Sequence, residues 1–172
     1  MTERTEFGYK RTVCDCEECT INCRFIPGMM IPSDLVRLKS RIGEGFEDWA
    51  DSHIAASPGA IVAFQGQMFR IPTLVPARGP DGACIFLKDG KCDIHADSPY
   101  GCAFFDSHIP HPKTYAMSTE GLQTILDDWR EGGEYARLWM RLAETGKYAP
   151  APEVNRRKIK EYLENQDGNR GK

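Results

Sequence analysis

The chain has 172 residues and a formal net charge of −3, which excludes the strongly basic surface of a typical nucleic-acid-binding protein. Its longest strongly apolar run, residues 60–64, is far shorter than the roughly 20 residues that cross a bilayer. Residues 1–11 contain no apolar core of a signal peptide. We therefore expect a cytoplasmic protein that binds neither nucleic acid nor membrane.

The first third of the chain predicts a polar segment followed by two helices. Residues 1–13 are polar, and we expect them to be loosely ordered. A helix should open at Pro32, with Ser33 as its cap, and should be interrupted at Gly43. A second, short helix is expected within residues 46–58, where a Pro-Gly pair stops it.

The rest of the chain predicts strands and then long helices. Residues 60–76 contain two apolar runs and predict two short strands joined near Gly66, the second of them irregular or at an edge. A broad apolar stripe predicts a long helix over residues 118–145, broken or bent at Gly132 and its neighbour. A final charged helix is expected over residues 153–165.

Cysteines are the most informative residues in this chain. Six fall into two groups and a seventh lies just ahead of the first group; they are Cys14, Cys16, Cys19, Cys23, Cys84, Cys92 and Cys102. Structural disulfides are rare in a reducing compartment, so clustered thiols predict a metal centre. The Asp-Gly pair at 89–90 is a tight-turn signal and predicts a small hairpin that brings Cys84 and Cys92 together.

These elements predict an α+β fold. We expect a small, irregular metal-thiolate domain with short strands and several helices, and C-terminal helices that pack on it. The predicted units are a polar N-terminal segment (1–13), a cysteine-cluster metal-binding domain (14–115) and a C-terminal helical region (116–172). Metal binding would hold the first cysteine group onto the middle of the domain.

Residues 16–23 and 84–102 resemble the YkgJ-type cysteine-cluster family, which is named for its CxxCxxCC motif and described as zinc- or iron-chelating. The second stretch is the closer match, because its three cysteines recur in the family's order with Phe-Leu, Asp-Gly and Pro between them. The resemblance covers residues 14–106. It implies that the six cysteines of the two groups are direct metal ligands.

Two positions depart from the family pattern. Asn22 stands where the family has its third cysteine, and Cys14 is an extra thiol that could substitute for it. If no thiol substitutes, one iron position could be open to substrate or sensor chemistry. Ser98 replaces the Arg that usually precedes the family's Pro, which removes any contact made by that Arg.

The ligand supply leaves the metal open between iron and zinc. Two zinc sites of four thiolates each would need one cysteine more than the chain has. One site of three cysteines and a histidine is an alternative, with His95 as the nearest histidine after Cys92. A supply of thiolates at irregular spacing favours an iron–sulfur cluster, such as [4Fe–4S], or another iron centre over zinc. We interpret His108 and His111 as residues of a solvated loop.

The sequence therefore predicts a metal-cluster-binding protein with a redox, sensing or accessory role, which could act with a protein partner. One alternative is an interaction module built on structural zinc. Another is a protein-modifying enzyme, because lysine N-methylases that act on flagellin are similar to the cysteine-cluster family. Against the enzyme, the chain is short and shows no recognisable S-adenosylmethionine loop. No catalytic residue is predicted.

Overall fold

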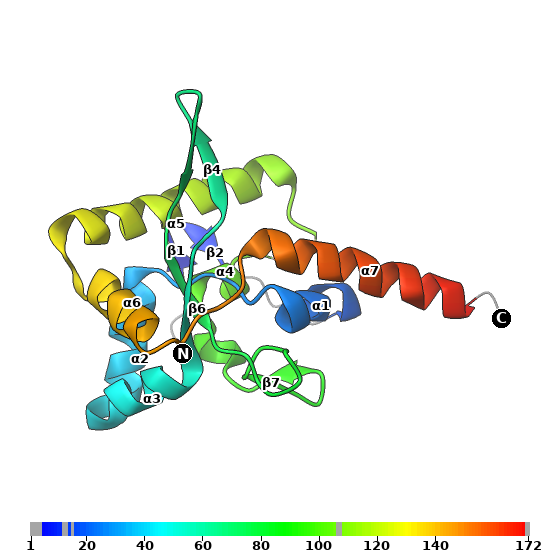
Figure 1. Ribbon diagram of the computed structural model, residues 1–172, viewed down its shortest axis with the longest axis horizontal. Coiled ribbons are helices and arrows are strands. Elements are labelled where there is room, and N and C mark those ends of the chain that lie inside the picture. The colour runs from blue at the N-terminus through cyan, green and yellow to red at the C-terminus, as the bar shows by residue number, and fades with distance from the viewer. Residues whose placement is uncertain (1–4, 12–13, 15, 106–107, 171–172) are drawn as a thin grey trace.

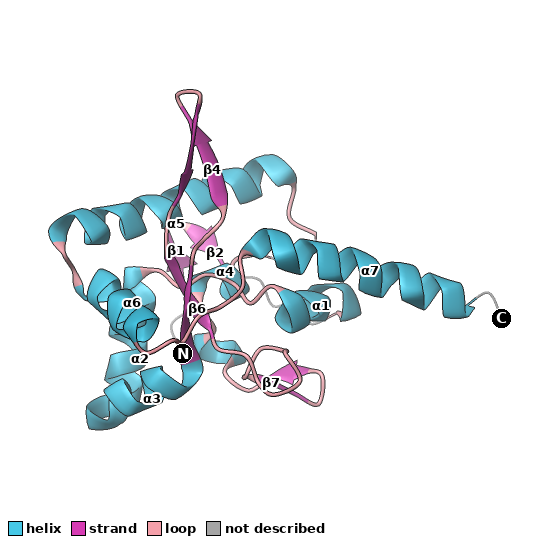
Figure 2. Ribbon diagram, in the orientation of Figure 1, coloured by secondary structure: helices cyan, strands magenta, loops and turns pink. Residues whose placement is uncertain are grey.

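The computed structural model describes residues 5–11, 14, 16–105 and 108–170. It confirms an α+β fold, in which helices surround short two-stranded antiparallel sheets (Figure 1 and Figure 2). In chain order the elements are β1 (Thr5–Glu6), β2 (Tyr9–Lys10), α1 (Glu17–Phe25), α2 (Pro32–Ile42), η1 (Gly43–Gly45), α3 (Phe46–His53), β3 (Ile54–Ser57), β4 (Ile61–Phe64), β5 (Gln67–Arg70), β6 (Thr73–Pro76), β7 (Leu87–Lys88), β8 (Lys91–Cys92), η2 (His95–Asp97), α4 (Tyr100–Ala103), α5 (His111–Glu131), α6 (Glu134–Glu144) and α7 (Pro152–Arg170).

The core lies where β3 and β6 pair and where α2, α5 and α6 pack around them. Ile54 of β3 and Leu74 of β6 are fully buried. On α6, the Tyr135 hydroxyl accepts the N–H of Leu74 at 2.6 Å and donates to the carbonyl of Met30 at 2.8 Å. This buried hydroxyl therefore joins α6, β6 and the segment that leads into α2.

The predicted strand pair around Gly66 is confirmed, but its second strand proves to be two. β4 and β5 form a hairpin that projects from the body (Figure 1), and Gln65 and Gly66 make its turn at positive φ. After this hairpin comes Pro72, which has no N–H for pairing, and β6 then crosses to pair with β3. Ile54 also begins a strand where the sequence predicts the end of a helix.

No helix is predicted from the sequence at the first cysteines, but the chain forms one, α1, there. Its first turn carries Glu17 and Glu18, which suit the positive end of the helix dipole. Cys16 is the N-cap residue, and Cys19 and Cys23 follow it at i+3 and i+7. This spacing places the three sulfur-bearing residues along one face of α1.

The predicted start of α2 is confirmed, although its cap differs from the prediction. Pro32 is the first helical residue and Ile31, not Ser33, is the N-cap. The N–H of Ile31 is accepted by the Asp34 carboxylate at 2.9 Å, which is the backward half of a capping box. The carboxylate at the third helical position therefore decides where this helix begins.

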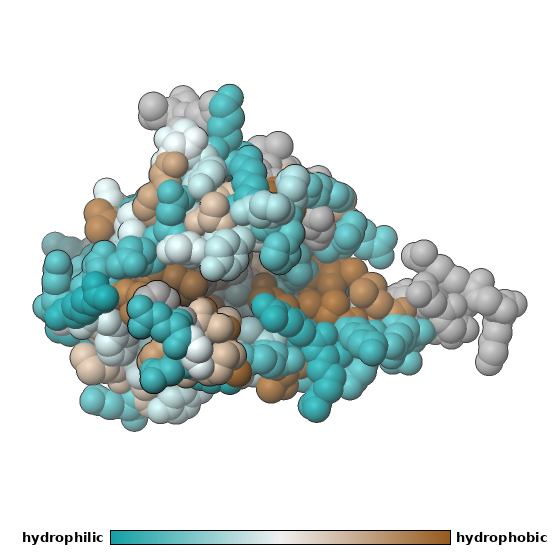
Figure 3. Space-filling view, turned by 90° about the horizontal axis from the view of Figure 1, so that it is seen from above, coloured by the Kyte–Doolittle hydropathy of each residue, from teal (hydrophilic) through white to brown (hydrophobic). Residues whose placement is uncertain are grey.

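The C-terminal half is helical, as predicted, but its boundaries differ. α5 begins at His111 rather than Ser118, and it ends where Gly132 adopts the left-handed conformation at φ 62°. α7 extends away from the body, and its Tyr162 ring lies 5.5 Å from that of Phe25 on α1 (Figure 1). Hydrophobic surface gathers on the side of the molecule towards which α7 extends, while hydrophilic residues cover most of the rest of this face (Figure 3). None of the described helices combines the length and apolar character needed to cross a membrane.

The N-terminal segment is more ordered than the sequence predicts. Residues 5–10 form the β1–β2 hairpin, and the Phe7 ring packs edge-on against Tyr100 with ring centroids 5.7 Å apart. The hairpin is therefore attached to the segment that carries α4. The domain limits expected at 14–115 and 116–172 stay a prediction.

Candidate metal centre

Three cysteines and one histidine form a compact set of ligands, which we call the outer group: Cys14, Cys16, Cys19 and His108. One ligand atom from each residue lies within 4.8 Å of the others. The cysteines come from the start of α1 and the segment before it, whereas the histidine comes from the turn that precedes α5. Three sulfurs and one imidazole nitrogen thus converge, which allows metal binding at this point.

Cys16 is the best-defined member of the outer group. Its Sγ lies 3.3 Å from Nε2 of His108, which is 92 residues away in sequence. The Thr20 backbone N–H and hydroxyl both donate to the Cys16 carbonyl at 3.0 Å, and they fix this residue as the first turn of α1 begins. The backbone N–H of Cys19, the His108 side chain and the Cys14 side chain together lower the pKa of Cys16 to about 7. A substantial fraction of this thiol is therefore ionised at neutral pH.

The other four cysteines lie outside the outer group, and we call them the inner group: Cys23, Cys84, Cys92 and Cys102. Among the described residues, no three of these sulfurs fall within 4.8 Å of one another. They are nevertheless neighbours in the fold. Cys84 donates its backbone N–H to the Cys23 carbonyl at 2.8 Å, and Cys92 lies on the β7–β8 hairpin that follows Cys84.

Electrostatics distinguish the inner group from the outer one. Burial, with a smaller contribution from neighbouring thiolates, raises the pKa of Cys84 to about 12. Burial also raises the pKa of Cys23 and of Cys92. The pKa of Cys102 rises well above its ordinary value through burial and through the charges of Cys23, Cys84 and Cys92. These thiols keep their protons at neutral pH unless a cation is bound beside them.

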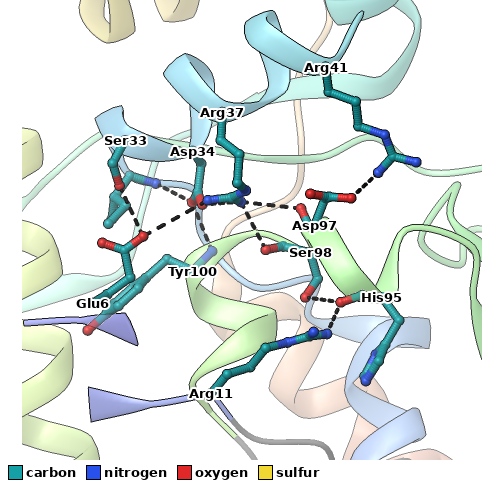
Figure 4. Close-up of polar contacts among 11 residues, drawn as sticks. Glu6, Arg11, Ser33, Asp34, Arg37, Arg41, His95, Asp97, Ser98 and Tyr100 are labelled. Carbon is teal, nitrogen blue, oxygen red and sulfur yellow. Dashed lines mark hydrogen bonds and ion pairs between the residues drawn. The ribbon is translucent and has the colours of Figure 1, made fainter. Parts of the chain in front are cut away.

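A buried polar network holds the segment that leads to Cys102 against α2 (Figure 4). Oδ2 of Asp34 accepts the N–H of Tyr100 at 2.8 Å, and Oδ1 accepts Arg37 at 2.7 Å. Arg37 also donates to the carbonyl of Ser98 at 3.2 Å, and Arg11 donates to the carbonyl of His95. The network fixes the chain between the β7–β8 hairpin and α4, so Cys102 has a defined position.

The four histidines of the chain lie in different surroundings. His108 lies in an exposed turn, as predicted, and it also belongs to the outer group, whereas His95 does not. His53 packs against the rings of Trp49 and Phe86, with its Nδ1 2.8 Å from the Trp49 carbonyl. The pair of histidines three residues apart, just after Cys102, was the available signal for His108. His111 lies outside the group, at the start of α5.

The position of Asn22 bears on the family resemblance. Its carbonyl accepts the Ile26 N–H at 2.6 Å near the end of α1, and the outer group does not include it.

Comparison of the chain with models of known protein families, with curated proteins and with solved structures finds no match. The resemblance to the cysteine-cluster family therefore depends on the motifs at residues 16–23 and 84–102 alone.

Proposed function

We propose that the protein is a metal-binding protein whose outer group holds one metal ion in tetrahedral geometry. The observation that supports this is the mutual approach of four ligand atoms to within 4.8 Å. Around a tetrahedral zinc ion, with zinc–sulfur distances of about 2.3 Å, neighbouring sulfurs lie about 3.8 Å apart. A modest contraction of the outer group reaches that spacing.

The compactness of the outer group favours a single ion over an iron–sulfur cluster at this place. In a [4Fe–4S] cluster each thiolate binds a different iron, so the cysteine sulfurs spread wider than around one ion. Three cysteines and a histidine are an established ligand set for zinc, and ferrous iron accepts the same soft donors. The preference for an iron–sulfur cluster that follows from the sequence alone therefore does not extend to the outer group.

We further propose that this ion has a sensing role. His108 is exposed and Cys16 is only half-buried, so metal and oxidants can reach the outer group from solvent. Hydrogen peroxide that oxidises two of its thiolates to a disulfide would take up their two electrons, together with two protons from solvent, and leave as two waters. The disulfide would no longer bind the ion, which would be released. Metal occupancy would thereby report the redox state.

Metal analysis of the full chain tests this proposal, with His108→Gln against His111→Gln as a matched pair. We expect His108→Gln and Cys16→Ser each to lose about one metal ion per chain. His111→Gln should keep its full metal content, because His111 lies outside the outer group. X-ray absorption of the bound metal should show a mixed sulfur and nitrogen shell that loses nitrogen in His108→Gln. Equal metal contents and identical shells in the two histidine variants would refute the proposal.

A further inference from the structure

The four cysteines of the inner group come from three separate segments that meet in the fold. We propose that they form a second metal-thiolate site, with four cysteine ligands and no histidine, which takes a zinc ion or a [4Fe–4S] cluster. This proposal shares no ligand with the proposed ion of the outer group, so either site can fail without the other. Five features of the structure support it: backbone contacts, close packing, donors directed at sulfur, nearby positive charge and the number of ligands.

Backbone contacts are the first. The N–H of Cys84 donates to the carbonyl of Cys23 at 2.8 Å, so the loop before β7 is docked on the last turn of α1. Within that loop, the N–H of Leu87 donates to the Cys84 carbonyl at 2.9 Å, and Leu87 pairs with Cys92 across the hairpin. Cys84 and Cys92 are thus held at the base of one small hairpin, beside Cys23.

The second is the close approach that places Cys102. A Cβ at Gly28 would lie 2.1 Å from the carbonyl carbon of Gly101 and 2.4 Å from the nitrogen of Cys102. Only a residue without a side chain allows the two backbones to touch in this way. The Gly101 N–H donates to the Met29 carbonyl at 2.8 Å and locks the contact. The fourth cysteine is therefore pinned to the segment that follows α1.

Backbone donors directed at the sulfurs are the third. The N–H of Gly28 donates to Sγ of Cys102 at 3.2 Å. The backbone N–H groups of Phe86 and Ile94 lower the pKa of Cys84 and of Cys92, respectively, so they lie close to these two sulfurs. N–H groups that point at sulfur stabilise a thiolate, and such hydrogen bonds tune metal-bound cysteines. Neutral thiols that served only as packing side chains would gain little from such donors.

The fourth is the positive charge beside the group. Four thiolates on a divalent ion, or on a [4Fe–4S] cluster of charge +2, leave a net charge of about −2, which is costly to bury without compensation. The positive charge of Arg78 lowers the pKa of Cys84, and the positive charge of Arg11 lowers the pKa of Cys92. The Nε atom of each arginine is buried and lacks a hydrogen-bond partner among the described residues. Two guanidinium groups therefore supply the opposite charge that a loaded site requires.

The ligand count is the fifth. Two four-coordinate sites need eight ligands, and seven cysteines fall one short. His108 completes the outer group, which leaves four cysteines for the inner group. Cys19 and Cys23 are one helical turn apart on α1, about 6 Å along its axis, so the two sites share a helix as neighbours. Every cysteine of the chain then has a place.

Metal and sulfide analysis of anaerobically purified full-length protein tests the inner site. The variants are Cys92→Ser for the inner group and Cys16→Ser for the outer group, with Asn22→Ser as a control on the same helix. Cys92 is chosen because it is half-buried, and far-UV circular dichroism checks that each variant folds. Zinc alone in wild type should give two ions per chain. A cluster in the inner site should instead give four irons and four acid-labile sulfides in addition to one ion.

The two variants should lose different metals. Cys92→Ser should lose the inner zinc or all of the labile sulfide and keep the outer ion. Cys16→Ser should lose the outer ion and keep the metal of the inner group. Sulfur coordination in a two-zinc wild type should average about 3.5 per ion, from seven thiolates on two ions. If Cys92→Ser folds with unchanged metal and sulfide, the inner site is refuted. If Cys16→Ser alone keeps its full metal content, the outer site fails instead. Loss of all metal in both variants would refute two separate sites.

Discussion

The outer and inner groups share α1 but differ in almost every physical property. The outer group is half-buried or exposed, compact, and includes Cys16, whose pKa falls to about 7. The inner group is packed against backbone and arginine side chains, is spread wider, and includes Cys84, whose pKa rises to about 12. Two sets of the same side chain, one helical turn apart, are thus prepared for opposite behaviour.

This difference suggests a division of labour between the two groups. A thiol that is ionised at neutral pH and open to solvent can exchange its metal and react. Thiols that are buried among fixed backbone donors favour a metal that stays and holds segments together once it is bound. The inner group would then stabilise α1, the β7–β8 hairpin and α4 as one unit, while the outer group would respond to the surroundings.

Thiol reactivity should show the largest contrast. At pH 7 in the metal-free protein, about half of Cys16 is thiolate but only about one part in 10⁵ of Cys84. The lower intrinsic nucleophilicity of the more acidic thiol reduces this advantage, and we expect Cys16 to react about 300-fold faster with a small disulfide reagent. Mass spectrometry of quenched time points measures both rates. Rates within tenfold of each other would contradict the contrast.

Sequence periodicity and turn residues were enough to predict much of the fold. The apolar spacing of α2 and α6 and the turn residues at Gly66 and at 89–90 determine local structure, so these elements are predictable. α1 was missed because its recurring side chains are cysteines rather than apolar residues, and none of its residues is buried. The β3–β6 pairing was missed because Ile54 and Pro76 are brought together only by the tertiary fold.

The residue types of the candidate site were predictable from the sequence. The division of the cysteines between the outer and inner groups was not. Clustered cysteines indicate a metal centre from sequence alone. Whether Cys23 joins Cys19 or Cys84 depends on how α1 docks, which no spacing rule contains. The inclusion of His108 likewise depends on a contact with Cys16 across 92 residues. The sequence alone does not tell which of these residues lie close together in space.

A change in the packing around Cys102 should affect the inner group and leave the outer group unchanged. Gly28→Ala places a Cβ against the backbone of Gly101 and Cys102, and the two segments must move apart. We expect a loss of about 3 kcal/mol in the free energy of unfolding, or roughly 6–12 °C in Tm, with weakened metal binding at the inner group only. Gly45→Ala is the control, because a Cβ there meets nothing within 4 Å and its φ is −81°. Equal Tm values for the two variants in calorimetry would contradict this packing.

The pH dependence of stability tests the same contrast through the sign of its slope. Cys84 has an ordinary pKa of 9.0 when exposed and a pKa of about 12 in the fold, so between these values the unfolded chain has released a proton that the folded chain keeps. The metal-free protein should therefore lose stability as pH rises from 9 towards 12, by about 1.4 kcal/mol per pH unit from this thiol, and the contribution is fully present below pH 9. Cys84→Ser should lack that part of the slope in denaturant titrations.

A bound metal changes this dependence. A bound metal requires thiolates, so loading releases protons and becomes stronger as pH rises through the range where the thiols would otherwise be protonated. The loaded protein should therefore gain stability as pH rises towards 9, where the unfolded chain still holds the protons that the loaded fold has released, and this thiol should cause no loss between pH 9 and 12. Cys84→Ser should reduce the gain in the loaded protein and the loss in the metal-free one. If loaded and metal-free proteins show parallel curves, the inner cysteines are buried side chains that bind nothing. A gain below pH 9 that only the loaded protein shows, and that depends on Cys84, would instead identify them as ligands.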